Sequence, residues 1–373
     1  MEAVFRSQKP GFVYTRIGNP TIAEFERRIA AVEGGAGAVA CASGMAAVAM
    51  ALVNILDAGD EIVAANGLYG GSLSLLHDLE RLGIGVRFSR SASAEDIAGK
   101  ITPRTKVVFG EVIGNPSLEV MDVRAVADIA HAHGLPLFVD ATTATPVLMR
   151  TIDHGADVVI HSTSKYINGF ADAIGGVIID SARFAWDGAR WPALAKYSAM
   201  PRLAFTRRLR DDTWQHFGPC MAPATAWLNT LGLETLPLRV ERECDNALAL
   251  AEALCETDGV SDVRYPSFSQ KDLCTRQFAN GRAGAILTFR TGSKERAFRL
   301  LDALECALLV SNIGDVRTLA LHPASTIFMH SDAAEREAAG VYDDLVRVSV
   351  GIEDIDDLVR DFRQAARRMN GND

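Results

Sequence analysis

The sequence has few cysteines, and none of them forms a recognisable metal or disulfide motif. Six cysteines are scattered over 373 residues, with no Cys-x-x-Cys pair and no neighbouring histidine ligands. A disulfide scaffold and a structural zinc site are therefore not expected, and we predict no metal site. Reduced thiols in a cytoplasmic protein are the expectation.

Long apolar runs and a secretory leader are also missing. No stretch approaches the roughly 20 apolar residues that a membrane helix requires. The first six residues, Met-Glu-Ala-Val-Phe-Arg, lack a charged segment followed by an apolar core. We therefore expect a soluble protein that does not bind membranes.

Positive charge is not in excess. The formal net charge is −9, and such an acidic chain is a poor candidate for nucleic-acid binding. We interpret the local cluster Arg202, Arg207, Arg208 and Arg210 as a subunit contact or a solvated helix face.

Because 48% of the residues are hydrophobic and 23% are charged, the chain has enough apolar material for a full core, which excludes a disordered or fibrous protein.

Short apolar runs alternate with helical stretches through the first half of the chain. A mainly parallel sheet covered by helices on both faces produces this pattern, so we predict an α/β fold. A first helix is expected after Pro20. The predicted strands lie at 38–41, 61–65, 86–89, 106–112, 136–141, 157–162 and 176–180.

A domain boundary is predicted near residues 231–238, where Leu-Gly-Leu-Glu-Thr-Leu-Pro precedes a helix expected over 240–256. Further strands and helices follow and indicate a smaller α/β domain. We predict an N-terminal arm with the first helix at 1–35, a large domain at 36–235 and a C-terminal domain at 236–373. That division suits a chain of this length.

Residues suited to ligand binding or catalysis follow several predicted strands. Ligands bind at the carboxyl ends of the strands in parallel sheets. The turn Ala-Ser-Gly-Met-Ala-Ala at 42–47 opens a helix and offers main-chain N–H groups to an anion, although an empty turn explains it equally well. Asp140 is suited to a protonated heterocyclic nitrogen, with a helix cap or salt bridge as the alternative.

Lys165 follows the strand at 157–162, beside hydroxyl side chains. A lysine kept out of bulk water has a lowered pKa and forms Schiff bases, whereas most lysines are simply solvated.

Tyr14 and Arg16 place a phenol and a guanidinium on one side of an extended segment. The guanidinium suits phosphate, and a surface loop is the alternative.

Together these features are the parts that a pyridoxal phosphate enzyme needs: a nucleophilic lysine, an acid for the pyridine nitrogen and a phosphate cradle. No G-x-G-x-x-G follows a strand and no G-x-x-x-x-G-K-[ST] occurs, so the sequence does not support a dinucleotide site or a P-loop.

At this level of detail the chain resembles the cystathionine γ-synthase-like, or Cys/Met-metabolism, group of fold-type I pyridoxal phosphate enzymes. The resemblance implies a mainly parallel seven-stranded sheet with helices on both faces and a smaller C-terminal α/β domain. Six ordered segments carry it: Tyr-Thr-Arg-Ile-Gly-Asn-Pro-Thr at 14–21, Ser-Gly-Met at 43–45, Tyr-Gly-Gly-Ser at 69–72, His-Ser-Thr-Ser-Lys-Tyr-Ile-Asn-Gly at 161–169, His-Pro-Ala-Ser at 322–325 and Arg-Val-Ser-Val-Gly-Ile at 347–352.

The resemblance implies specific roles. Lys165 would form the Schiff base with pyridoxal 5'-phosphate and move protons, Asp140 would keep the pyridine nitrogen protonated, and Tyr69 would stack on the ring and act in acid–base steps. Asn312 and Arg347 would bind the substrate, with Arg347 holding its α-carboxylate. Other cofactor-binding residues would be Ser43, Gly44, Met45, Asn115, Ser162, Ser164 and, from a neighbouring subunit, Tyr14 and Arg16.

Those last two residues imply a homo-oligomer, a dimer with shared active sites that assembles further into a tetramer. The sequence also departs from the family pattern. Ala141, Thr143 and Phe170 stand where Asn, Phe and His are usual, and the N-terminal arm is short. None of these changes removes a catalytic group.

The reaction is predicted from smaller differences. Arg317 stands where cystathionine-handling members carry Glu, so a second ammonium group would be repelled. Asn-Ile-Gly-Asp at 312–315 and Glu-Val-Ile-Gly-Asn-Pro at 111–116 resemble the O-acetylhomoserine sulfhydrylase branch, and methionine γ-lyases often have Cys in place of Gly71.

We therefore predict γ-replacement on O-acetylhomoserine by sulfide or a thiol, within methionine metabolism. The alternative is a γ-lyase acting on methionine, canavanine or a related amino acid, so the enzyme class is a transferase or a carbon–heteroatom lyase. From other classes, an aminotransferase and a non-catalytic cofactor-binding homologue remain.

Overall fold

The computed structural model describes residues 2–5, 8–9, 11–329, 331–332, 336 and 339–371. Both ends of the predicted domain division, Met1 and residues 372–373, lie outside them. A short helix α1 (Glu2–Phe5) comes first, and α2 (Pro20–Glu33) begins at the predicted proline. The side chain of Asn19 accepts the N–H of Thr21, which caps α2.

Seven strands form one large sheet in the order β1-β7-β6-β5-β4-β2-β3. Strand β7 is antiparallel to β1 and β6, and the remaining pairs are parallel. The predicted mainly parallel seven-stranded sheet is therefore confirmed. Its strands are β1 (Gly37–Cys41), β2 (Glu61–Ala64), β3 (Gly85–Phe88), β4 (Thr105–Glu111), β5 (Leu137–Asp140), β6 (Val158–Ser162) and β7 (Gly176–Asp180).

Helices cover both faces of this sheet because successive strand residues point to opposite sides. On β4, Val108 packs into one buried cluster, whereas Val107 and Phe109 pack into the other. The first cluster includes residues of α2, α5 (Ala94–Ala98), α6 (Val123–Ala132), α7 (Thr145–Leu148) and α10 (Pro223–Cys255). The second includes residues of α3 (Gly44–Val53), α4 (Gly70–Arg81), α8 (Ala204–Arg208) and α9 (Trp214–Phe217).

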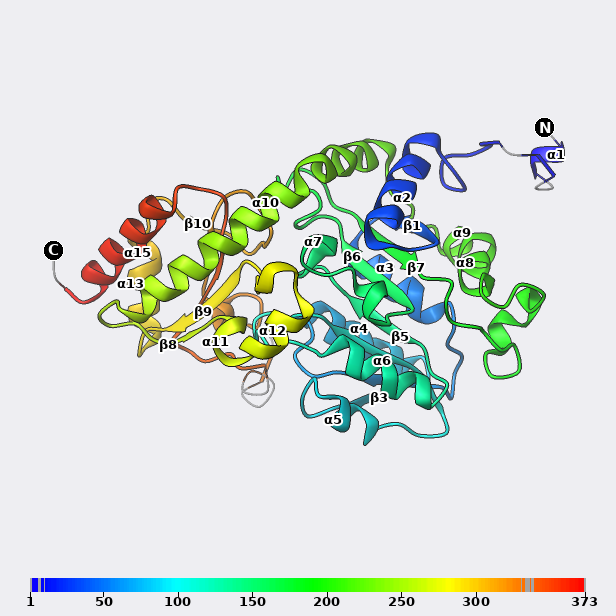
Figure 1. Ribbon diagram of the computed structural model, residues 1–373, viewed down its shortest axis with the longest axis horizontal. Helices are drawn as coiled ribbons and strands as arrows, with labels where there is room; N and C mark the ends of the chain where they lie inside the picture. The colour runs from blue at the N-terminus through cyan, green and yellow to red at the C-terminus, as the bar shows by residue number, and fades with distance from the viewer. Residues whose placement is uncertain are drawn as a thin grey trace.

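A second sheet of five strands, in the order β10-β11-β12-β9-β8, follows the first along the chain. Only β10 and β11 are parallel. Figure 1 shows α10 extending from the region of the large sheet to the second sheet, where α13 and α15 also lie. The elements are β8 (Ser261–Arg264), α11 (Pro266–Ser269), α12 (Lys271–Gln277), β9 (Ile286–Arg290), α13 (Lys294–Asp302), β10 (Leu308–Leu309), β11 (Leu319–Leu321), β12 (Leu345–Ser349) and α15 (Ile355–Met369).

Helix α10 corrects the predicted start of a helix at Val240, because it runs unbroken from Pro223 to Cys255 through Pro237. A proline inside a helix removes one main-chain hydrogen bond. The carbonyl left without its helical donor is that of Leu233, four residues before the proline. The guanidinium of Arg239 donates to the neighbouring carbonyl of Gly232 (2.8 Å). The predicted domain boundary between residues 235 and 236 falls within this helix and stays a prediction.

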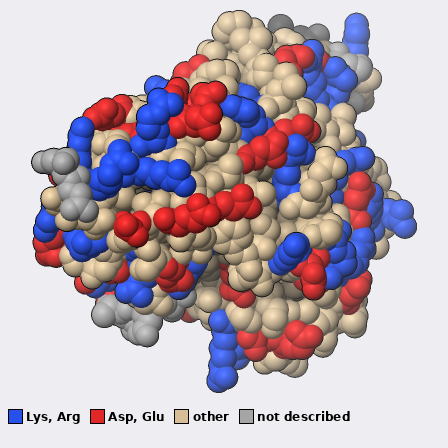
Figure 2. Space-filling view, turned by 60° about the vertical axis from the view of Figure 1, so that its left-hand side comes forward, with Lys and Arg blue, Asp and Glu red and all other residues tan. Residues whose placement is uncertain are grey.

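The surface carries both signs of charge. Figure 2 shows basic and acidic side chains interspersed over one face of the molecule. Two arginines of the predicted basic cluster are engaged within the chain, since Arg208 donates to the carbonyl of Asn54 and Arg210 pairs with Glu26. Within the part of the chain that the structure describes, no helix has the length and apolar character needed to cross a membrane.

Candidate active site

A cavity of about 380 Å³ lies at the carboxyl ends of β4, β5 and β6. Glu111, Asp140 and Ser162, the last residues of these three strands, all line it. The structure brings together every predicted site residue except Tyr14 and Arg16. The predicted residues in the lining are Ser43, Gly44, Met45, Tyr69, Asn115, Asp140, Ser162, Ser164, Lys165, Asn312 and Arg347.

Lys165 lies in the loop after β6, and its amine donates a hydrogen bond to the side-chain oxygen of Asn312. Burial and, to a smaller extent, the positive charge of Arg347 together lower the pKa of this amine to about 8. An amine with this pKa is partly uncharged near neutral pH, so it is available as a nucleophile or a base.

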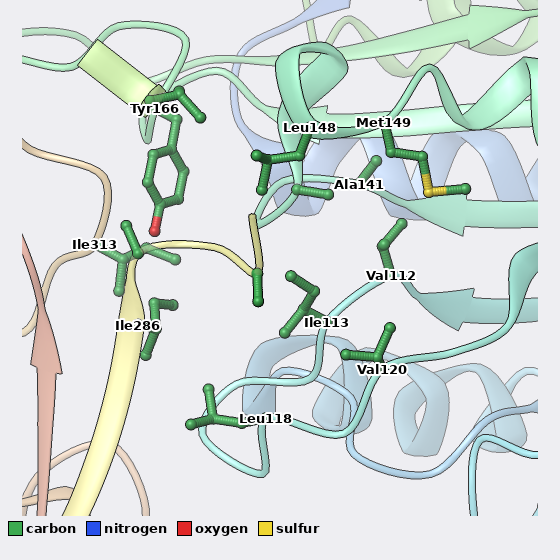
Figure 3. Packing of buried hydrophobic residues seen from close by; sticks show 14 of the residues in the cluster. Val112, Ile113, Leu118, Val120, Ala141, Leu148, Met149, Tyr166, Ile286 and Ile313 are labelled. Atoms are coloured by element: carbon green, nitrogen blue, oxygen red, sulfur yellow. The ribbon is translucent and has the colours of Figure 1, made fainter. Parts of the chain in front are cut away.

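Tyr166 anchors the main chain next to this lysine. Its carbonyl accepts a hydrogen bond from Arg239 of α10 (2.7 Å), and its side chain is 2% exposed. Figure 3 shows the ring pointing toward Ile313 and Ile286, and Ile286 belongs to the second sheet. Packing between the two sheets therefore fixes the residue that follows Lys165.

The N-terminus of α3 forms an anion site at the cavity. The hydroxyl oxygen of Ser43 accepts the N–H of Ala46 (3.0 Å), which leaves the first main-chain N–H groups of the helix, at Gly44 and Met45, without partners inside it. A Cβ on Gly44 would lie 2.6 Å from Cβ of Ser162. Glycine is therefore required for the helix to approach β6 this closely.

The two predicted serines differ in their contacts. Ser162 lines the cavity, and its main-chain N–H donates to the hydroxyl oxygen of Thr142 (2.8 Å). The hydroxyl of Ser164 donates to the carbonyl of Gly175 (3.2 Å) and accepts the N–H of the same residue (3.0 Å). A contact from the Ser164 hydroxyl to a phosphate would have to replace the first of these bonds.

Two carboxyl groups lie side by side in the cavity wall, because Glu111 and Asp140 are register partners at the ends of β4 and β5. Desolvation raises the pKa of both carboxyls, and that of Glu111 is well above its ordinary value. Hydrogen bonds from Thr142 and the charge of His161 act in the opposite direction on Asp140. Asp140 is therefore the better carrier of negative charge.

Arg347 on β12 supplies the opposite charge. Its side chain donates to the carbonyl of Asn312 (2.9 Å) and to the side-chain oxygen of Asn115 (3.2 Å), and the residue is 3% exposed. Burial lowers its pKa to about 10. The buried Nε has no partner among the described residues. A guanidinium held in this way is suited to a carboxylate ligand.

Tyr14 and Arg16 do not line the cavity of their own chain. The guanidinium of Arg16 lies 5.3 Å from the centre of the Tyr14 ring and donates to the carbonyl of Gln215 (2.6 Å). The Tyr14 side chain is exposed. Their predicted contribution from a neighbouring subunit stays a prediction.

Arg317 is also absent from the cavity lining. It forms a two-point ion pair with Asp315, with both N–O distances at 2.9 Å. Its charge is thereby balanced, so the expectation that Arg317 repels a second ammonium group in the cavity is wrong. Phe170 lies outside the lining too, beneath the guanidinium of Arg239.

The sequence motifs gave no role to several residues that line the cavity, notably Glu111, Ser72 and Thr142. Glu111 was part of a family motif, and its place at a strand end was the signal that could have identified it. Strand-end position singled out Asp140 in the same way.

The residues present fit pyridoxal phosphate. The α3 N-terminus suits its phosphate, Asp140 suits its ring nitrogen, and the amine of Lys165 suits its aldehyde. The buried, unpaired Nε of Arg347 is an independent structural sign of an anion-binding cavity.

Comparisons with known proteins agree with this fit. A family model described as Cys/Met metabolism PLP-dependent enzyme matches residues 1–367. The chain is 38% identical to an O-acetyl-L-homoserine sulfhydrylase of Leptospira meyeri, over 98% of this chain and 88% of the relative. It is 41% identical to a homocysteine synthase of Schizosaccharomyces pombe, over 97% and 88%.

A solved structure is similar as well. It is described as a putative O-acetylhomoserine (thiol)-lyase from Campylobacter jejuni with a pyridoxyl-lysine monophosphate residue. The TM-score is 0.93 at 33% identity, over 98% of this chain and 91% of that one. From the match along nearly its whole length, the chain belongs to the family of Cys/Met metabolism PLP-dependent enzymes, and its cofactor is pyridoxal 5'-phosphate.

Proposed function

We propose that this enzyme replaces the acetoxy group on the γ-carbon of O-acetylhomoserine by sulfide or a thiol. In this reaction the Cγ–O bond breaks, a Cγ–S bond forms, and acetate leaves. The observation that carries the proposal is the similarity over almost the entire chain to relatives named O-acetyl-L-homoserine sulfhydrylase and homocysteine synthase. The cavity supports it, because it combines a buried amine, an acid and a carboxylate-binding arginine.

When bound, pyridoxal phosphate supplies an electron sink that stabilises negative charge on the substrate carbons next to the amino group. Lys165 would hold the cofactor and then move protons at these carbons, for which a pKa near 8 is well matched. Asp140 would keep a proton on the ring nitrogen, and Tyr69 would lie against the ring.

Substrate and phosphate would be held at different ends of the cavity. Arg347 would bind the α-carboxylate, oriented by its hydrogen bonds to Asn312 and Asn115. The proposed phosphate-binding groups are the hydroxyls and N–H groups of Ser43, Gly44, Met45, Ser162 and Ser164.

We further propose a cytoplasmic homo-oligomer, a dimer with shared sites that pairs into a tetramer. Tyr14 and Arg16 would complete the phosphate site of the neighbouring subunit, which is supported by their position outside their own cavity. The six cysteines are free, as expected in a reducing compartment.

A substrate panel tests the reaction. O-acetylhomoserine, methionine, canavanine, homocysteine and cystathionine are each incubated with and without sulfide, and thiol adducts are measured alongside ammonia and 2-oxobutyrate. Homocysteine and acetate should form only from O-acetylhomoserine with sulfide. Release of 2-oxobutyrate from methionine or canavanine, without turnover of O-acetylhomoserine, would instead establish the γ-lyase alternative.

Lys165→Ala provides the matched test of the site. Turnover should fall by more than about 10²-fold, since the variant lacks the amine that moves protons. Borohydride should then trap no adduct on the peptide that contains residue 165. Lys271→Ala, an exposed lysine on α12, is the control and should retain both turnover and the adduct.

A further inference from the structure

Glu111 is a carboxyl group in the cavity wall to which the proposed mechanism assigns no task. It is 9% exposed, and one of its oxygens accepts the main-chain N–H of Tyr69 (2.7 Å). The hydroxyl of Ser72 contacts the same carboxyl. Glu111 therefore joins the end of β4 to the first turn of α4, where Tyr69 stands.

Tyr69 has few other constraints. It precedes α4 without a side-chain cap, and its side chain is 45% exposed. Its ring lies over Gly71, because a Cβ on that glycine would be 2.5 Å from a ring carbon. The hydrogen bond to Glu111 thus fixes the main chain from which this ring projects.

The charge state of Glu111 follows from its surroundings. Asp140 on β5 is the charged neighbour, and α4 presents only the amide of Tyr69 and the hydroxyl of Ser72. Among the described residues, no basic side chain forms a hydrogen bond or ion pair with Glu111. Burial and the charge of Asp140 raise the pKa of Glu111 well above its ordinary value, so it retains its proton while Asp140 ionises.

We propose that Glu111 is a positioning residue, which holds Tyr69 in place through its main-chain amide. This inference rests on the proposed function, in which Tyr69 lies against the cofactor ring. Glu111 works as a neutral acid whose carbonyl oxygen accepts the amide proton. A glutamine offers the same oxygen and carries no charge, whereas an alanine offers neither.

Paired variants of the full-length holoenzyme test this role. Glu111→Ala should lower kcat and increase the rate of cofactor release, each by about tenfold, which corresponds to one lost hydrogen bond. Glu111→Gln should recover most of both losses. Glu119 also accepts a main-chain N–H, from Ala92, but lies outside the cavity, so Glu119→Ala and Glu119→Gln are matched controls.

Stability against pH provides a readout that does not depend on activity. Because the pKa of Glu111 is raised in the folded state, the unfolded chain loses this proton first, and wild-type stability falls as pH rises. Glu111→Gln lacks this loss. As pH rises above about 4.3, the ordinary pKa of glutamate, the variant's free energy of unfolding should therefore increase relative to that of the wild type.

A double-variant cycle separates this proposal from the proposed function. In a Tyr69→Ala background, Glu111→Ala should add little to the rate of cofactor release, because the side chain that Glu111 positions is gone. The proposal would be overturned if Glu111→Ala had the same effect in that background as in the wild type. It would also be overturned if Glu111→Ala and Glu111→Gln lost equal kcat and cofactor retention, or if the stability of Glu111→Gln fell relative to the wild type as pH rises. None of these outcomes bears on which substrate is used.

Discussion

Asn312 lies between the two cationic side chains of the cavity. Its side-chain oxygen accepts the hydrogen bond of Lys165, while its main-chain carbonyl accepts one from Arg347. A neutral amide at this position leaves the mutual repulsion of the two cations uncompensated. Burial is the main cause of the low pKa of Lys165, about 8, and this repulsion by Arg347 adds to it.

The first prediction concerns the binding of cofactor to the apoprotein. Only the uncharged amine of Lys165 attacks an aldehyde, so the rate of reconstitution should rise with pH through about 8, measured by absorbance after mixing. Asn312→Asp places a carboxylate beside the amine, which favours the charged form and should move this rise to higher pH. An unchanged midpoint would show that residue 312 does not control the amine.

A second prediction concerns substrate affinity. Arg347→Ala should raise KM for O-acetylhomoserine by about 10- to 100-fold, as expected for the loss of a charged hydrogen bond. Cofactor content, measured by absorbance, should change far less. Arg317→Ala is the control, because that guanidinium pairs with Asp315 outside the cavity and should leave KM unchanged. Loss of cofactor without a rise in KM would reassign Arg347.

Adjacent glycines at the start of α4 give a third prediction. A Cβ on Gly71 would lie 2.5 Å from the Tyr69 ring and 3.1 Å from the sulfur of Met45, whereas one on Gly70 would have no neighbour closer than 4.0 Å. Gly71→Ala should displace the ring and lower kcat/KM by about 10²-fold, while Gly70→Ala should not. Similar kinetics for the two variants would mean that the ring position is unimportant.

The fourth prediction tests shared active sites by subunit complementation. Arg16→Ala and Lys165→Ala are each purified, dissociated, mixed and reassembled with cofactor. If Arg16 serves the neighbouring subunit, the hybrid contains one intact site, and the mixture should be more active than either parent. A mixture of Lys165→Ala with Asp140→Asn should not recover activity, because both defects fall in the same chain's cavity. Failure of the first mixture would place Arg16 in its own subunit.

The sequence predicted the large sheet well because its strands are continuous apolar runs and its functional residues follow them. In a parallel sheet the strand ends meet at one edge, so Asp140 and Lys165 come together in the cavity although 25 residues of chain separate them. Only the family resemblance predicted that Asn312 and Arg347 belong to the site. Sequence spacing alone does not reveal how the second sheet packs on the first.

Two expectations failed for physical reasons that no local pattern records. Pro237 suggested a helix boundary, yet α10 continues through it, since a proline inside a helix removes one main-chain hydrogen bond without ending the helix here. Arg317 suggested a charged cavity wall, yet Asp315 binds it outside the cavity.

The contact between Arg239 and the carbonyl of Tyr166 limits how the polypeptide can be divided. A recombinant fragment ending at residue 235 would keep all seven strands of the large sheet but would lose Arg239. The carbonyls of Tyr166 and Gly232, each now paired with its guanidinium, would then need new donors. A fragment that carries the large sheet alone should therefore end beyond this arginine.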